Sequence, residues 1–229
     1  MKHFLGLALL FAAALLLASC GLSAKDDAAL WQSTFPVNKT ALTNTGVAHY
    51  FVLQPGYRLT YNHGEATLTV TVLPETKLVD GVQTCVVEER EVENGQLAEI
   101  SRNYFALDPA TGDVYYFGED VDMYKNGKVT GHGGSWLSGV GSAHFGLMMP
   151  GAPKVGQRFQ HEVAPNVAMD RAEVTCVTAT VTTPAGEFKN CVEIAETSLL
   201  EKGTGHKAYA TSVGMVRDDE YVLVKVERP

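Results

Sequence analysis

The strongest constraint on the fold is a period-two alternation of apolar and polar residues that recurs along the chain from His49 onward. It is clearest at residues 65–73, where threonine alternates with leucine and valine. Successive side chains of a β-strand point to opposite faces of its sheet, so this pattern is typical of a strand with one buried face. β-Branched residues, which favour extended backbone, supply most of these positions. We therefore expect a half-buried strand here.

Turn residues separate further runs of the same kind. Predicted strands occupy residues 82–92, 96–107, 113–124, 171–182, 187–197, 207–212 and 221–227. Asp80-Gly81, Asn94-Gly95 and Asn126-Gly127 accept the positive φ angles of tight hairpins. No stretch has a helical period long enough to connect parallel strands, so the chain is expected to be mainly β, with a single antiparallel sheet.

The N-terminus has the pattern of an export signal. Residues 4–17 form an uncharged, mostly apolar run behind Lys2, and at 14 residues this run is shorter than the roughly 20 that span a bilayer. Leu17-Ala18-Ser19-Cys20 follows, and it resembles the lipobox of bacterial lipoproteins. Residues 1–19 are thus predicted to be a lipoprotein signal peptide, with Cys20 as the lipidated residue. The alternative is an ordinary cleaved signal peptide and a soluble periplasmic protein.

Lipidation at Cys20 implies an envelope protein held to the membrane by its N-terminal lipid. More than one acyl chain, such as palmitate, gives a stable anchor at about 0.8 kcal/mol per buried methylene. Gly21 follows the cysteine where an aspartate would favour the inner membrane, so an outer-membrane location is expected in a Gram-negative host. Residues 20–48 show little periodicity and are expected to be a tether, and residues 49–229 a single β-rich domain.

Charge and glycine patterns exclude several functions. Lys and Arg number 18 against 26 Asp and Glu, which gives a formal net charge of −8. Nucleic-acid binding needs a clustered basic surface, so nucleic acid is not an expected partner. The glycines match neither a Walker loop nor a dinucleotide-binding fingerprint, and no cofactor is expected. No catalytic signature is present, so the sequence assigns no catalytic residue.

Three cysteines remain after Cys20, in a compartment that favours disulfides. A hairpin turning at residues 183–186 places Cys176 nearly opposite Cys191, which predicts a bridge between them. A bridge between Cys85 and Cys191 is the rival pairing, and reduced, buried thiols are the other alternative. No Cys-x-x-Cys motif is present to lower a thiol pKa.

Residues 131–156 interrupt the strand pattern, since eight of these 26 residues are glycine. Long loops in compact domains are often functional, so this segment is expected to lie over the open side of the sheet and form a binding site. The expected ligand-binding residues are Trp136, His144, Phe145, Met148 and Met149, with Tyr115 and Phe117 from the preceding strand. His132 and His144 are candidates for a soft metal site, but packing beneath a loop explains them more simply, and no metal is predicted.

Several segments resemble a family of uncharacterised bacterial secreted proteins and lipoproteins. They are residues 104–106, 113–120, 134–136, 149–156, 183–188 and 207–210, which span most of the mature domain. This resemblance implies no particular activity. The strand order is also similar to the half-barrel of the LolA and LolB lipoprotein carriers. That likeness implies a curved antiparallel sheet, a half-barrel or incomplete barrel, which cups an apolar ligand.

Together these patterns favour a lipid-anchored envelope protein that binds an apolar small molecule, a lipid or an envelope partner. Two alternatives remain open. One is a surface-tethered hydrolase or metal-dependent enzyme that uses residues 131–156, with His132 and His144 near the acidic residues around Glu119. The other is a structural or assembly lipoprotein.

Overall fold

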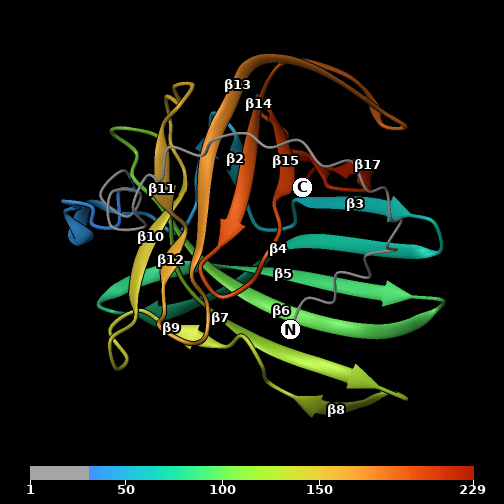
Figure 1. The fold of residues 1–229 in the computed structure, drawn as a ribbon, viewed down its shortest axis with the longest axis horizontal. Coiled ribbons are helices and arrows are strands. Elements are labelled where there is room, and N and C mark those ends of the chain that lie inside the picture. The colour runs from blue at the N-terminus through green and yellow to red at the C-terminus, as the bar shows by residue number, and fades with distance from the viewer. Residues whose placement is uncertain (1–30) are drawn as a thin grey trace, which may run out of the picture.

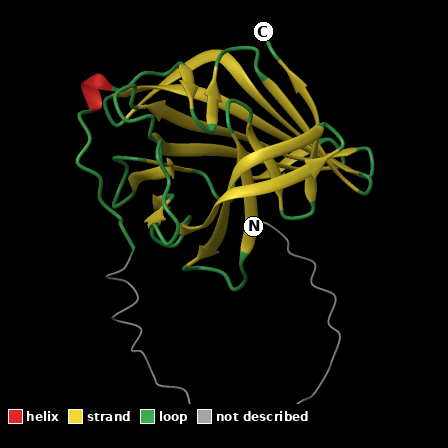
Figure 2. Cartoon of the chain, turned by 90° about the horizontal axis from the view of Figure 1, so that it is seen from above, coloured by secondary structure: helices red, strands yellow, loops and turns green. Residues whose placement is uncertain are grey.

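The computed structural model describes residues 31–229, so the predicted signal peptide, Cys20 and the first part of the expected tether lie outside the described residues. The described chain is mainly β, as expected, and its only helix is the short 3₁₀ turn η1 (Lys39–Ala41) (Figures 1 and 2). No helix between residues 31 and 229 has the length and apolar character needed to cross a bilayer.

The strands belong to one large antiparallel sheet and one small hairpin. In chain order they are β1 (Gly46–Ala48), β2 (Phe51–Leu53), β3 (Arg58–His63), β4 (Ala66–Val79), β5 (Val82–Glu93), β6 (Gln96–Leu107), β7 (Val114–Lys125), β8 (Lys128–Gly131), β9 (Trp136–Leu137), β10 (His144–Met149), β11 (Arg158–Gln160), β12 (Glu162–Val163), β13 (Asp170–Thr183), β14 (Gly186–Ser198), β15 (Gly205–Ala210), β16 (Gly214–Asp218) and β17 (Tyr221–Glu227). The main sheet has the order β11-β13-β14-β15-β16-β17-β3-β4-β5-β6-β7-β10-β12, with β8 and β9 also paired to β7.

The predicted tight turns join the long strands of this sheet. Asp80, Asn94 and Asn126 have φ angles of 49°, 50° and 53°, and each is followed by a glycine that also has positive φ. These conformations match the right-handed twist of the strands that they connect. The meander from β3 to β7 therefore follows the order expected from the sequence, and it fans out on one side of the molecule in Figure 1.

The sheet curls until its two ends almost meet, leaving an incomplete barrel with one unsealed seam. A single short segment supplies both ends. Its first part, β11, pairs with β13, and its second part, β12, pairs with β10. His161 joins the two parts, and its backbone N–H donates to the carbonyl of Asp170 at 2.9 Å. The barrel is thus nearly closed by one change of strand partner at His161.

The close approach of the strands at the seam requires a residue without a Cβ atom. Gly146 of β10 lies so close to β11 that a Cβ atom there would overlap the carbonyl oxygens of Gln160 and His161. Any side chain would therefore force β10 away from the seam. Gly146 belongs to residues 131–156, so this glycine-rich segment has a packing role. The segment was expected to be a loop, yet β9 and β10 lie within it as paired strands.

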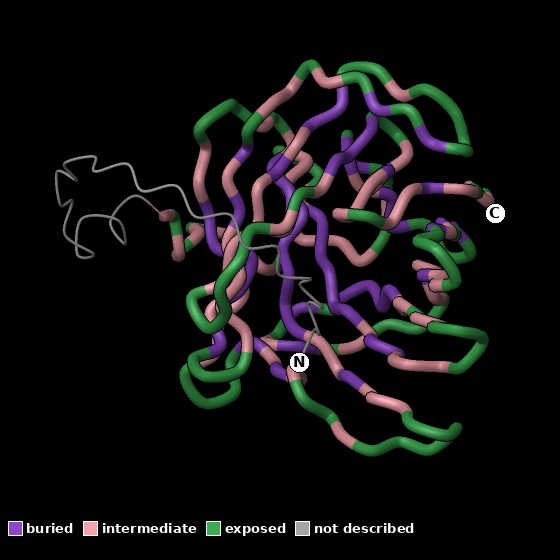
Figure 3. The backbone as a smooth tube through the Cα atoms, turned by 45° about the vertical axis from the view of Figure 1, so that its right-hand side comes forward, coloured by how far each residue is buried: buried purple, intermediate pink, exposed green. Residues whose placement is uncertain are grey.

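The hairpin of β1 and β2, which we call the N-terminal hairpin, closes one end of the barrel. Its Leu53 is fully buried, and Phe51 packs edge-to-face on Phe105 with ring centroids 5.2 Å apart. The carbonyl of His49 accepts a hydrogen bond from the N–H of Ser212 in the β15–β16 turn. Buried backbone is concentrated in the middle of the strands and exposed backbone at their turns (Figure 3).

Residues 31–45, which we call the arm, lie against the barrel, whereas the sequence suggested a tether up to residue 48. Gln32 pairs with β11, since its N–H donates to Arg158 and its carbonyl accepts from Gln160. Phe35 covers Tyr115 on the outer face of the sheet. The arm, although weakly periodic in sequence, shields apolar and aromatic side chains on that face from water.

The cysteine pairing expected from the hairpin is absent from the described chain, where Cys85, Cys176 and Cys191 are all free thiols. Irregularities in the β13–β14 pairing place Cys176 opposite Glu193 and Cys191 opposite Ala179. The two sulfur-bearing residues are therefore not cross-strand partners. Cys85 and Cys191 are buried, and Cys176 is partly exposed.

If Gly146 permits closure of the barrel, Gly146→Ala should lower the free energy of unfolding by about 1–3 kcal/mol, the usual cost of forcing atoms into a packed site. Gly131→Ala is the matched control, since no atom lies within 4 Å of a Cβ there. Urea unfolding of both variants measures the difference. Equal stability of the two variants would contradict this account of the seam.

Candidate ligand-binding cavity

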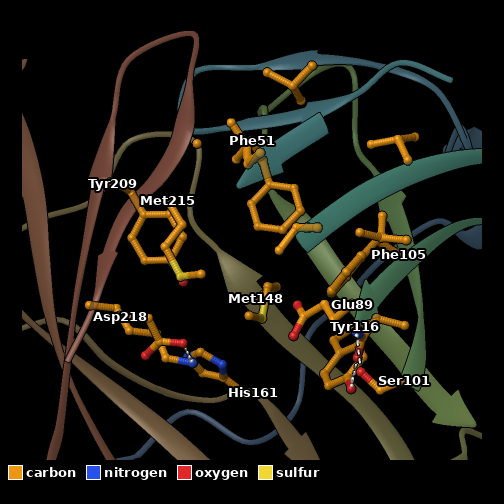
Figure 4. A pocket seen from close by; sticks show the side chains of 18 of the residues that line it. Phe51, Glu89, Ser101, Phe105, Tyr116, Met148, His161, Tyr209, Met215 and Asp218 are labelled. Atoms are coloured by element: carbon orange, nitrogen blue, oxygen red, sulfur yellow. Dashed lines mark hydrogen bonds and ion pairs between the residues drawn. The ribbon is translucent and has the colours of Figure 1, made fainter. Parts of the chain in front are cut away.

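The interior of the barrel contains a cavity with about 140 Å³ of free space (Figure 4). Protein interiors are normally packed with few voids larger than a water molecule, so this space is unusual. Strands from all sides of the barrel line it, together with the N-terminal hairpin.

The wall beside the N-terminal hairpin is mostly apolar. Its side chains come from the hairpin itself, from the meander and from the strands opposite: Phe51, Val52, Tyr57, Leu59, Val70, Val72, Val87, Phe105, Met148, Tyr209, Val213 and Met215. Phe105 also stacks on Tyr116, with ring centroids 5.0 Å apart. This half of the cavity can exclude water and accept a hydrocarbon group.

The wall at the other end, which we call the acidic end, contains seven carboxyl groups: Glu89, Glu99, Glu119, Glu162, Asp170, Glu196 and Asp218. Lys207 and His161 are the only basic side chains among the lining residues. In Figure 4, Asp218 and His161 lie on one side of the cavity, and Glu89, Ser101 and Tyr116 on the other. The cavity therefore has an apolar half and a negatively charged half.

Lys207 is held between two of these carboxylates. Its Nζ lies 3.3 Å from Oε2 of Glu196 and 3.6 Å from Oδ2 of Asp218, with the Lys207 side chain only 12% exposed. Burial alone would lower the pKa of Lys207, but Asp218 and Glu196 hold it well above its ordinary value. The ammonium thus keeps its charge inside the barrel.

His161 and Glu162 belong to the seam and also line the cavity. The Nδ1 atom of His161 lies 3.8 Å from Oε2 of Glu196, and its ring stacks on Phe159. Glu162 is buried and accepts a hydrogen bond from the backbone N–H of Asp170 at 2.6 Å. Burial, followed by the charge of Asp170, raises the pKa of Glu162 well above its ordinary value. Glu162 is therefore a neutral acid over a wider pH range than an exposed glutamate.

Two tyrosine hydroxyls in the wall donate hydrogen bonds to backbone carbonyls. Tyr57 donates to the carbonyl of Val213 at 2.9 Å, and Tyr61 donates to the carbonyl of Met215 at 2.8 Å. Burial, and next the charge of Glu89, raises the pKa of Tyr61 well above its usual range. These hydroxyls stay protonated and fix the wall in place.

Of the ligand-binding residues predicted from the sequence, only Met148 lines this cavity. Tyr115, Phe117 and Phe145 form an aromatic cluster beneath the arm, with Phe117 and Phe145 stacked at 4.7 Å. The remaining three lie elsewhere. Met149 is buried in the core, Trp136 borders a separate shallow groove, and His144 contacts the backbone of Phe145. Most of these residues therefore contribute to packing within the protein, because neighbouring strands and the arm bury them.

The residues of the enzyme alternative do not converge. His132 lies 3.0 Å from Asp122, with its side chain 67% exposed, and neither His132 nor His144 lines the cavity that contains Glu119. Among residues 31–229, no three His, Cys, Asp or Glu side chains are placed to share a metal ion. Burial also raises the pKa of Cys85 to about 12, which makes it a poor nucleophile.

The interior carboxylates were missed at the sequence level. A signal was present in β6, where Glu99, Ser101 and Asn103 occupy one face in alternation with Ile100 and Arg102. A polar face usually points to solvent, so the pattern by itself suggests an outer surface. Only closure of the sheet places this face inside.

No protein-family model matches the chain, and no curated protein matches it. Two solved structures are similar in part. A "putative lipoprotein" from Parabacteroides distasonis ATCC 8503 is 14% identical with a TM-score of 0.38, and the match covers 80% of this chain and 100% of that chain. A "putative exported protein with YmcC-like fold" from Bacteroides fragilis NCTC 9343 is 17% identical with a TM-score of 0.36, over 79% and 100% of the two chains.

Both TM-scores are too low for these likenesses to assign a family or a function, so the function proposed below rests on this chain's own residues. The similarity to LolA and LolB carriers stays a prediction.

Glu162 gives a pH-dependent prediction. A glutamate whose pKa is raised by folding stabilises the fold most below its unfolded value, near 4.5, and loses that contribution as the pH rises through the folded value. Glu162→Gln keeps an oxygen for the N–H of Asp170 and removes the titration. The variant should be more stable than the wild type at neutral pH, by about 1.4 kcal/mol for each unit of raised pKa.

Urea unfolding across the pH range measures this effect, and the advantage should disappear below about pH 4. Glu187→Gln, at a glutamate paired with Lys189 on the surface, is the control and should not raise the stability at neutral pH. A Glu162→Gln variant that is less stable than the wild type at neutral pH would show that the charged form is favoured.

Proposed function

We propose that this protein is a lipid-anchored protein of the bacterial envelope that binds a small apolar or amphipathic molecule inside its barrel. The observation that carries the binding proposal is the interior cavity, with its apolar wall between the N-terminal hairpin and the meander. An apolar wall of this kind favours a hydrophobic group, because binding removes apolar surface from water.

Support for the anchor comes from the sequence. Leu17-Ala18-Ser19-Cys20 ends an apolar run of export-signal length, and Gly21 favours the outer membrane of a Gram-negative host. Gln32, twelve residues after Cys20, already pairs with β11. A protein anchored in this way would hold its barrel close to the lipid surface, where apolar and amphipathic molecules are concentrated.

The binding proposal is tested by filling the cavity. Val70 lines it, whereas Val129 on β8 is 45% exposed on the outside, so Val70→Phe and Val129→Phe place the same ring inside and outside the barrel. Octan-1-ol is a suitable neutral probe, and isothermal titration calorimetry gives its Kd. We expect Val70→Phe to weaken binding by roughly tenfold and Val129→Phe to leave it unchanged. Absence of octanol binding to the wild type would refute the proposal.

The anchor is tested separately by Cys20→Ser. The full-length wild-type protein should incorporate labelled palmitate and fractionate with membranes, and the variant should do neither, because the acyl chains need the thiol. A wild type that takes up no label and fractionates like the variant would show that the protein is not lipid-anchored.

A further inference from the structure

We infer that the cavity is selective for a cationic amphiphile, which it binds with an amino group at the acidic end and an apolar group against the N-terminal hairpin. This inference rests on the proposed binding function and specifies the chemical class and the orientation of the ligand.

The division of the cavity runs across neighbouring strands. Val70, Glu89 and Ser101 are partners across β4, β5 and β6. One step closer to the hairpin, Val72 faces Val87. On β5 the wall thus changes from charged at Glu89 to apolar at Val87, about 7 Å along the strand. A ligand that fits such a wall has a polar group joined directly to an apolar group.

The sign of the polar half selects the charge of the ligand. Seven carboxyl groups line it against one lysine and one histidine. Acidic side chains thus outnumber basic ones in the lining. An ammonium bound there would meet carboxyl oxygens of Glu89, Glu99 and Glu119, which line the wall formed by the meander. A carboxylate or phosphate would find few basic groups there and would also lose its hydration.

Lys207 is an internal example of the interaction that we infer. A primary ammonium on β15 already lies between Glu196 and Asp218, within 4 Å of both, inside the barrel. Glu89, Glu99 and Glu119 extend the same type of lining onto the opposite strands, β5 to β7. Carboxyl groups therefore line the opposite wall as well, where we infer that the ammonium of a ligand binds.

Three probes with the same octyl chain separate charge from hydrophobicity: octylamine, octan-1-ol and octanoate. Calorimetric titration at neutral pH and low salt should give the tightest Kd for octylamine, by roughly tenfold over octan-1-ol, with octanoate the weakest. Added salt should weaken octylamine binding more than octan-1-ol binding, because mobile ions screen the attraction.

Glu89→Gln tests the wall directly, and Glu88→Gln is its matched control. The two residues are adjacent on β5, but Glu89 lines the cavity and Glu88 pairs with Arg102 on the outer face. Glu89→Gln should weaken octylamine binding severalfold and leave octan-1-ol binding unchanged, which also shows that the variant is folded. Glu88→Gln should change neither.

The outcomes distinguish this inference from the function on which it rests. If octan-1-ol binds and octylamine binds no more tightly, the cavity is a binding site but the cationic selectivity is wrong. If octanoate binds most tightly, the selectivity is the reverse of the one inferred. If none of the three probes binds, the proposed binding function itself fails.

Discussion

Pairing of one short segment with both ends of the sheet is the constraint on which the rest of the structure depends. β11 and β12 are separated only by His161, and they hydrogen-bond to β13 and β10 respectively. Gly146 allows this approach because it has no side chain. Closure turns one face of every strand inward, so side chains that an open sheet would expose to water become the lining of a cavity. Both the hydrophobic core and the acidic end follow from that closure.

The acidic end is costly for folding and therefore informative about function. Carboxylates lose hydration when they are enclosed, and they repel one another. Lys207 offsets part of this cost for Glu196 and Asp218, and the raised pKa of Glu162 shows that the surroundings favour its neutral form. An apolar lining would stabilise the same barrel more. Residues that lower the stability of the fold, and that no packing requirement explains, are expected at functional sites. The amphipathic cavity fits that description.

Local rules predicted the strands well and the site poorly. The alternation at residues 65–73 and the turn at Asn94-Gly95 are set by neighbouring residues, and both appear as expected in β4 and the β5–β6 hairpin. Glu89 and Glu99 could not be assigned to the interior, because their position depends on a closure more than 60 residues away in sequence. Tyr115, Phe117 and Phe145 were assigned to a ligand for a similar reason, since nothing local indicates that the arm covers them. Of the residues predicted to bind a ligand, only Met148 lines the cavity.

The central claim is that the barrel is hollow beside the N-terminal hairpin. Crystals of the protein under xenon pressure test it most directly, because xenon binds empty apolar cavities and gives a strong anomalous signal. The account predicts a xenon atom in the space bordered by Phe51, Val72 and Phe105, with the hairpin unmoved. An interior filled by the side chains of the hairpin, with no xenon bound, would contradict it.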